Sequence, residues 1–236
     1  MAKLKELRLQ VEGGREVSAL LNRPANARRI LALAHGAGAG MSHPFMESLS
    51  SKLAEVGIAT LRYQFPYMEA QRRVPDAPAV LTATVAAAVR TASGAASGLP
   101  LLAGGKSMGG RMTSQAVAEG LLEGVTGLAF FGFPLHPPNR PGTKRADHLA
   151  KVTLPMLFLQ GTRDAFAGLE LLRPILAKLG HRATLHVIDG ADHSFHVPKK
   201  SGKTDADILA ELAETTSSWS DNLGNDEKLH LGISAP

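Results

Sequence analysis

The chain has 236 residues, of which 44% are hydrophobic and 20% are charged, a composition that excludes a disordered chain. Its length suits one domain with a single core, and the absence of cysteine excludes disulfides and thiolate metal sites. The net charge of +5 could suit a nucleic-acid partner. However, the basic residues are scattered and the chain has only one Trp and two Tyr, so we expect no nucleic-acid binding.

The N-terminal residues 1–14 lack the apolar stretch of a secretory signal. No apolar run approaches the roughly 18 residues that a membrane span needs. We therefore expect a cytoplasmic protein without membrane contact. We also expect a monomer or homodimer that uses no cofactor.

The first predicted elements are strands. Residues 6–11 alternate between apolar and polar, and together with residues 16–21 they predict an antiparallel hairpin. Residues 29–35 form a continuous apolar run that ends in glycines, which is typical of a central parallel strand buried on both faces. A helix is predicted next, over residues 43–57, from the helical spacing of its apolar residues.

From residue 58 onwards, strands and helices alternate. The predicted strands are 58–65, 100–105, 125–133, 155–161 and 183–189, and the predicted helices are 77–94, 111–122, 167–179 and 205–220. Such alternation predicts an α/β fold with a mostly parallel central sheet and helices on both faces. We expect a single domain over residues 1–220, followed by a polar C-terminal tail over residues 221–236.

The stretch LLAGGKSMGG, residues 101–110, resembles two different motifs. A phosphate-binding P-loop, G-x-x-x-x-G-K-[ST], would need a glycine at position 100 if Gly105 were its second glycine. That position holds Pro100, which has no backbone N–H, and residues 100–105 are predicted to be a strand and not a loop. The spacing therefore excludes the P-loop.

The alternative motif is the nucleophile elbow, G-x-S-x-G, between a strand and a helix. Residues 105–109 match it, with Ser107 at the centre. The serine of an elbow lies in a strained turn at positive φ, and the positions two residues away must be small because they are crowded. We therefore interpret Ser107 as a nucleophile. The alternative is an ordinary strand-to-helix turn, which would account for the glycines without any catalytic role for the serine.

A serine nucleophile needs a base, and the base needs an orienting acid. In folds with this elbow, these residues follow in the order serine, acid, histidine. Asp164 lies just beyond the strand 155–161 and His193 just beyond the last strand, so both fit the order. His196 is the nearest competitor for the base.

Asp189 and Asp192 are alternatives for the acid, but they lie in the histidine's own loop. A carboxylate from a neighbouring strand's loop has the better approach, which favours Asp164. The oxyanion of the reaction also needs two amide donors. We expect these to be the N–H of Met108, after the nucleophile, and the N–H of Ala37, in the loop after the strand 29–35.

The sequence resembles the alpha/beta-hydrolase superfamily from about residue 4 to residue 220. It is most similar to the small, capless, dienelactone-hydrolase-like members, which include bacterial hydrolases with the motifs HGAGAG, FPYMEA, GGKSMGGR and GFPLHPP, found here at 35–40, 65–70, 104–111 and 132–138. The resemblance implies an alpha/beta-hydrolase fold and a Ser107–Asp164–His193 triad. Dienelactone hydrolase itself uses a cysteine nucleophile, which this chain lacks, so its substrate is not carried over.

The segment 134–151 is too short for a cap domain, which predicts an open site. We expect Tyr67, Met68 and His136 to bind substrate there. One of the nearby arginines could pair with a substrate carboxylate, and the candidates are Arg72, Arg73, Arg111 and Arg163.

The favoured function is a serine hydrolase that cleaves small carboxylic esters, with lactones, thioesters and small peptides as alternative substrates. A non-catalytic hydrolase-like scaffold that binds a partner is the second hypothesis, because one fold hosts many functions. A metal site at residues 192–196 is disfavoured, because its two histidines lack the spacing and helical context of a metal motif.

Overall fold

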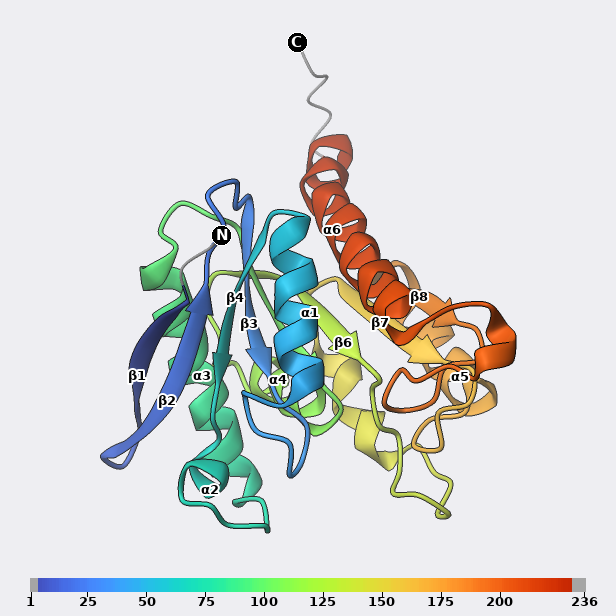
Figure 1. Cartoon of the computed structure of the whole chain (residues 1–236), viewed down its shortest axis with the longest axis horizontal. Helices are drawn as coiled ribbons and strands as arrows, with labels where there is room; N and C mark the ends of the chain where they lie inside the picture. Colours follow the sequence, from blue (N-terminus) through green and yellow to red (C-terminus); the bar gives the residue numbers. More distant parts are fainter. Residues whose placement is uncertain (1–3, 231–236) are drawn as a thin grey trace.

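The computed structural model describes residues 4–230, in which eight strands form one sheet with the order β1-β2-β4-β3-β5-β6-β7-β8 (Figure 1). The strands are β1 (Lys5–Val11), β2 (Arg15–Asn22), β3 (Arg29–Ala34), β4 (Ile58–Tyr63), β5 (Leu101–Lys106), β6 (Val125–Phe131), β7 (Met156–Gly161) and β8 (Ala183–Ile188). β1 and β2 form the predicted antiparallel hairpin, and β2 also pairs antiparallel with β4. All other pairs are parallel, which confirms the predicted fold class.

The helices follow the strands along the chain. They are α1 (Pro44–Glu55), α2 (Pro66–Glu69), α3 (Pro78–Ala95), α4 (Met108–Ala118), α5 (Leu169–Leu179) and α6 (Asp205–His230), with the short 3-10 helices η1 (Lys144–Lys151), η2 (Gly180–Arg182) and η3 (Lys199–Ser201). Helices pack on both faces of the sheet, and they bury their apolar sides against the strands.

Two buried apolar clusters flank the sheet. One cluster joins the sheet to α3, α4 and α5, and the other joins it to α1 and α6, which lie side by side (Figure 1). Along the parallel strands the register keeps the carboxyl ends level, with Ala34 beside Gly105, and Lys106 beside Phe131. Loops that leave these ends therefore meet at one edge of the sheet, where parallel sheets of this kind place their ligands.

Helix α4 begins at Met108, three residues before the predicted start at residue 111. The predicted helix begins after Gly109 and Gly110, and glycine forms helices poorly. The structure places them inside the helix because its first turn packs against backbone: a Cβ at Gly109 would lie 2.6 Å from the carbonyl oxygens of Ala34 and His35.

Helix α6 continues ten residues beyond the predicted end at residue 220, so residues 221–230 of the predicted polar tail are helical. Its extension is supported by Asp221, which pairs with Arg28 at 2.8 Å and with Arg29 at 3.3 Å. Nearby, Trp219 packs on β6, where a Cβ at Gly127 would lie 2.8 Å from the indole ring. Residues 231–236 of the predicted tail lie outside the described residues.

A second glycine constraint lies in the central strand β5. A Cβ added at Gly104 would collide with the carbonyl oxygen of Ala129 on β6. The neighbouring strand is backbone in a continuous sheet, so it cannot move aside as a flexible side chain could. Position 104 therefore requires glycine because the backbone of β6 lies too close for any side chain, and not because the residue has an unusual φ.

We expect Gly104→Ala to lower the free energy of unfolding by at least about 2 kcal/mol, because overpacking against backbone forces the sheet apart. Urea unfolding followed by circular dichroism measures this change. Gly94→Ala is the matched control, since Gly94 is an exposed residue of α3 with no heavy atom within 4 Å of an added Cβ. The control should be neutral or stabilising by up to about 1 kcal/mol, and an equal loss in both variants would contradict the argument.

Candidate active site

Ser107 occupies the turn between the end of β5 and the start of α4, as the elbow motif predicts. Its backbone has φ 51° and ψ −117°, a conformation that costs energy for any residue other than glycine. The turn is possible because its neighbours have no side chains: a Cβ at Gly105 would collide with the carbonyl oxygen of Ala34, and Gly109 is equally close to backbone. The hydroxyl of Ser107 is thereby presented at the carboxyl edge of the sheet.

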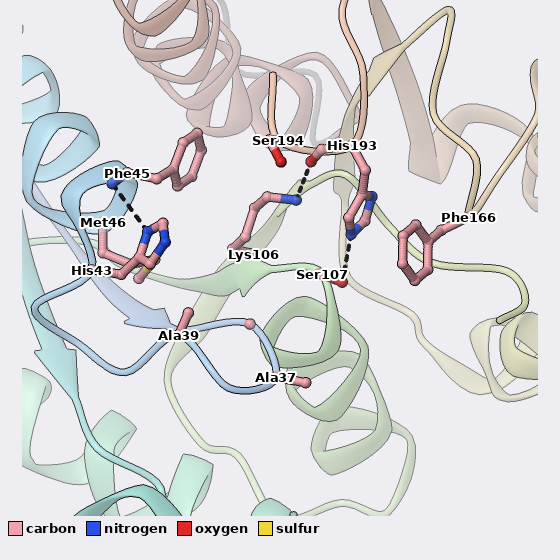
Figure 2. Close-up of a pocket in the computed structure, with 11 residues that line it drawn as sticks. Ala37, Ala39, His43, Phe45, Met46, Lys106, Ser107, Phe166, His193 and Ser194 are labelled. Carbon is pink, nitrogen blue, oxygen red and sulfur yellow. Dashed lines mark hydrogen bonds between the residues drawn. The ribbon is translucent and has the colours of Figure 1, made fainter. Parts of the chain in front are cut away.

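The structure brings the three predicted side chains together in one hydrogen-bonded chain. His193 Nε2 lies 2.8 Å from Ser107 Oγ, and His193 Nδ1 lies 2.7 Å from Asp164 Oδ2. Figure 2 shows the imidazole above the serine, with the ring of Phe166 stacked on it at 4.1 Å between centroids. In this arrangement the imidazole can accept the hydroxyl proton at Nε2 while Nδ1–H donates to the carboxylate.

The Asp164 carboxylate, 1% exposed, is fixed by donors on both oxygens. Oδ2 accepts from Gln160 Nε2 at 2.6 Å as well as from the imidazole, and Oδ1 accepts from the N–H of Phe166 at 2.8 Å. Gln160 is a fully buried polar residue of β7, and its amide oxygen also accepts from the N–H of Phe133 at 3.0 Å. A polar residue inside an apolar strand is the signal that could have identified Gln160 from the sequence.

Burial lowers the pKa of His193 below its ordinary value of 6.5, because removal from water disfavours the charged imidazolium. The hydrogen bond to Asp164 and the charges of Asp164 and Asp192 act in the opposite direction, whereas the positive charge of Lys106 adds to the lowering. The net effect is a neutral imidazole at neutral pH, which is the form that can accept a proton.

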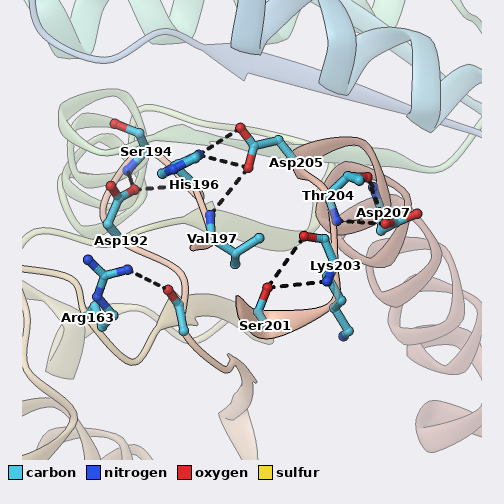
Figure 3. Close-up of polar contacts among 11 residues, drawn as sticks. Arg163, Asp192, Ser194, His196, Val197, Ser201, Lys203, Thr204, Asp205 and Asp207 are labelled. Atoms are coloured by element: carbon cyan, nitrogen blue, oxygen red, sulfur yellow. Dashed lines mark hydrogen bonds and ion pairs between the residues drawn. The ribbon is translucent and has the colours of Figure 1, made fainter. Parts of the chain in front are cut away.

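The loop that carries His193 is held by its own polar network (Figure 3). Asp192 Oδ1 accepts from the N–H groups of Ser194 at 2.8 Å and His196 at 3.0 Å. The ring of His196 donates to Asp205 at 2.9 Å, and Asp189 accepts from Thr162 at 3.3 Å. The competing residues His196, Asp189 and Asp192 are therefore engaged in other contacts, and it is His193 and Asp164 that connect to Ser107.

The loop after β3, residues 35–41, lies opposite the histidine loop. The Nδ1–H of the buried His35 donates to the carbonyl oxygen of Gly36 at 2.7 Å, and its Nε2 accepts from the N–H of Phe65 at 3.2 Å. Burial lowers the pKa of His35 to about 4, so the ring stays neutral and keeps one acceptor nitrogen. The Tyr67 hydroxyl accepts from the N–H of Gly38 at 3.0 Å.

The far end of the same loop is held at Met41. Its N–H donates to Gln64 Oε1 at 3.0 Å, and its carbonyl oxygen accepts from the buried Arg62 at 2.8 Å. Residues 62–67 thus hold the loop over most of its length. Sequence reasoning did not identify Arg62 or Gln64, because only the pairing of β4 with β3 brings them to this loop.

A cavity of about 280 Å³ opens beside Ser107 (Figure 2). Its walls come from the loop after β3, the start of α1, and the histidine loop, and they are Gly36, Ala37, Ala39, His43, Phe45, Met46, Lys106, Ser107, Phe166, His193 and Ser194. Ala37, one of the two residues predicted to supply an oxyanion amide, is in this wall. Met108, the other, is the first residue of α4.

The three residues predicted to bind substrate are not among those that line this cavity. Tyr67 is fully buried and its hydroxyl contacts the loop after β3, while Met68 lies near Gly40 of the same loop. The backbone N–H of His136 donates to the Phe166 carbonyl oxygen at 3.1 Å.

The four arginines predicted as carboxylate partners also lie outside this cavity. Arg72 pairs with Asp76 at 2.5 Å, and Arg163 donates to the carbonyl oxygen of Gly190 at 3.2 Å. Arg111 lines a separate polar cavity of about 300 Å³ between α4 and η1, and Arg73 is exposed.

Within residues 4–230, no group of three or more His, Asp or Glu side chains is placed to hold a metal ion. In the same range, no helix is long and apolar enough to cross a membrane.

Comparison with solved structures finds the same fold in several proteins. A dienelactone hydrolase from Anabaena variabilis matches with 22% identity over 92% of this chain and 96% of its own, with a TM-score of 0.72. An esterase domain from a Rhodothermus marinus protein matches with 18% identity, 92% and 98% coverage and a TM-score of 0.69. A serine hydrolase without a lid from Xanthomonas campestris matches with 18% identity, 92% and 95% coverage and a TM-score of 0.72.

At these identities the solved structures indicate the fold and not the reaction. A family model described as an alpha/beta hydrolase domain matches residues 27–221, which is well over half of the chain and includes Ser107, Asp164 and His193. The chain therefore belongs to the alpha/beta hydrolase family.

Proposed function

We propose that this protein is a serine hydrolase that cleaves small carboxylic esters through an acyl-enzyme intermediate. The observation that carries the proposal is the hydrogen-bonded chain Ser107–His193–Asp164, with the serine in a strained turn beside a cavity. The names of three proteins with the same fold, a dienelactone hydrolase, an esterase domain and a serine hydrolase without a lid, agree with this choice.

In the first half of the reaction, Ser107 Oγ attacks the ester carbonyl and its proton moves to His193 Nε2. The carbonyl oxygen becomes an oxyanion, and the imidazolium is stabilised by Asp164. When the tetrahedral intermediate collapses, the bond to the alcohol breaks and the alcohol leaves with the proton from His193. In the second half, water attacks the acyl group while His193 Nε2 takes a proton from it. The second tetrahedral intermediate then collapses: the bond between Ser107 Oγ and the acyl carbon breaks, His193 returns the proton to Ser107 Oγ, and the carboxylic acid is released.

We propose that the oxyanion is held by the N–H groups of Met108 and Ala37. The Met108 amide is at the start of α4, where backbone donors have no partner within the helix and the helix dipole favours negative charge. Ala37 lies in the loop held by His35 and Tyr67, and this support fits the preorganisation that such donors need.

The cavity beside Ser107 supports small substrates. Its volume of about 280 Å³ is at the lower end of ligand sites, and several of its walls are apolar, among them Ala37, Ala39, Phe45, Met46 and Phe166. The segment between β6 and β7 contains only a loop and η1, so no helical cap covers the cavity from that side. These features favour short acyl groups over long chains.

We expect Ser107→Ala to abolish reaction with a fluorophosphonate probe and to reduce hydrolysis of p-nitrophenyl acetate at least about 10³-fold, because the nucleophile is removed. Circular dichroism and thermal unfolding check that the variant is folded. Ser93→Ala is the matched control, because Ser93 is an exposed residue of α3 that does not line the cavity. A folded wild-type protein that neither reacts with the probe nor cleaves activated esters would overturn the proposed function.

The lowered pKa of His193 predicts the pH dependence of kcat/KM. Since the base must be neutral, activity should fall as the pH drops through the pKa of His193, and the midpoint of this fall should lie below 6.5. Initial rates between pH 4.5 and 7.5 measure the midpoint. His186→Gln alters a histidine of β8 that pairs with Glu211 of α6 and does not line the cavity, so it should leave the profile unchanged. A midpoint above 6.5 would contradict the assignment.

We expect Tyr67→Phe to lower kcat roughly tenfold with little change in KM, because the N–H of Gly38 loses its acceptor and the loop that carries Ala37 is less well held. Tyr63→Phe is the matched control. The Tyr63 hydroxyl is buried and makes no hydrogen bond to the loop after β3 among the described residues, so its removal should leave kcat unchanged. Equal effects of the two substitutions on kcat would contradict the role given to Tyr67.

A further inference from the structure

Lys106, the residue before the nucleophile, contributes a buried charge to the site. The side chain lines the cavity beside Ser107, and only 9% of the residue is exposed. Its Nζ donates to the backbone carbonyl oxygen of His193 at 2.5 Å, as Figure 2 shows. The rings of Phe45 and Phe195 lie 5.8 and 5.4 Å from Nζ and surround the ammonium group with aromatic faces.

The ammonium group also lies close to the contact between His193 and Asp164. A Cβ built on Gly132 would lie 3.1 Å from Lys106 Nζ and 3.4 Å from both Asp164 Oδ2 and His193 Nδ1. The ammonium nitrogen, the carboxylate oxygen and the ring nitrogen therefore all lie around the position that a side chain at residue 132 would occupy. This space is free because residue 132 is glycine. Lys106 thus reaches His193 at two places, by a hydrogen bond to its main chain and by charge near its ring.

We propose that Lys106 is a positioning residue for His193: its ammonium group holds the backbone of His193 so that the imidazole spans Ser107 and Asp164, and its charge opposes protonation of that ring. This inference rests on the proposed serine hydrolase. Lys106 occupies the variable position before the serine in the G-x-S-x-G motif. The motif itself sets no requirement at this position, and the proposal gives it a function.

The charges around His193 support this role. Asp164 faces the ring from the loop after β7, Asp192 from the histidine loop, and Lys106 from β5, while His43 lies at the other end of the cavity (Figure 2). Burial lowers the pKa of Lys106 to about 8, with Asp164 and Asp192 acting against the lowering. Lys106 is therefore an ammonium ion below pH 7, where a charged donor holds a carbonyl oxygen more strongly than a neutral one.

The test uses Lys106→Met, which keeps the length and apolar stem of the side chain, and Lys106→Gln, which removes the charge but keeps a donor. We expect kcat of both variants for p-nitrophenyl acetate at pH 7 to fall at least about tenfold, with KM little changed. We also expect the acidic midpoint of kcat/KM to rise by about one pH unit, because the like charge that disfavours imidazolium is gone. Lys178→Met, which removes an exposed charge of α5, is the control and should change neither value.

A second measurement is independent of activity. The titration of the His193 imidazole is followed by NMR and assigned by the signal that disappears in His193→Gln. A higher His193 midpoint in either folded variant supports the proposal. A midpoint that stays at the wild-type value overturns it, even if kcat falls, because a purely structural loss would not change the titration. If the wild-type protein cleaves no ester, the proposed function fails, and the NMR titration still decides whether Lys106 acts on His193.

Discussion

The close packing of backbone around Ser107 is the constraint on which the rest of the site depends. The serine adopts φ 51°, and the carbonyl oxygens of β3 lie so near to Gly105 and Gly109 that neither position tolerates a side chain. The strain of the turn is sustained by the burial of β5 and α4 on both sides of it. Because the serine cannot relax into another conformation without moving β3, its hydroxyl has a fixed place to which the other groups can be matched.

The remaining groups reach that place from the carboxyl ends of neighbouring strands. Gln160 of β7 orients the carboxylate of Asp164, and the carboxylate orients the ring of His193. On the opposite side, Tyr67 and His35 hold the loop that contains Ala37. Asp164, His193 and the loop that contains Ala37 are thus each held by a polar partner, which is how a site keeps its geometry when side chains alone would be mobile.

Part of this arrangement could be predicted from the sequence. The order of strands and helices follows from local hydrophobic patterns, and Ser107, Asp164 and His193 could be selected because each follows a predicted strand. Gln160 stands out in the sequence as a polar residue of an apolar strand, but its contact with Asp164 could not be predicted, because the contact depends on which side chain of β7 faces the end of its own loop. Tyr67 is predicted to bind substrate, and the structure shows its hydroxyl at the N–H of Gly38 and not in the wall of the cavity. Sequence position alone does not tell whether a side chain points into a cavity. The local pattern does not reveal the contacts of Asp221 in the extended part of α6, because they join it to Arg28 and Arg29, nearly two hundred positions away.

The packing of Trp219 against Gly127 has a consequence for spectroscopy. Because the chain contains one tryptophan, its intrinsic fluorescence arises almost entirely from the interface between α6 and β6. An emission signal from this protein therefore reports on the docking of the last helix onto the sheet. The active site itself, lined by phenylalanine and histidine, is optically silent at the wavelengths that excite indole, so events in the cavity become visible only when they are transmitted to α6.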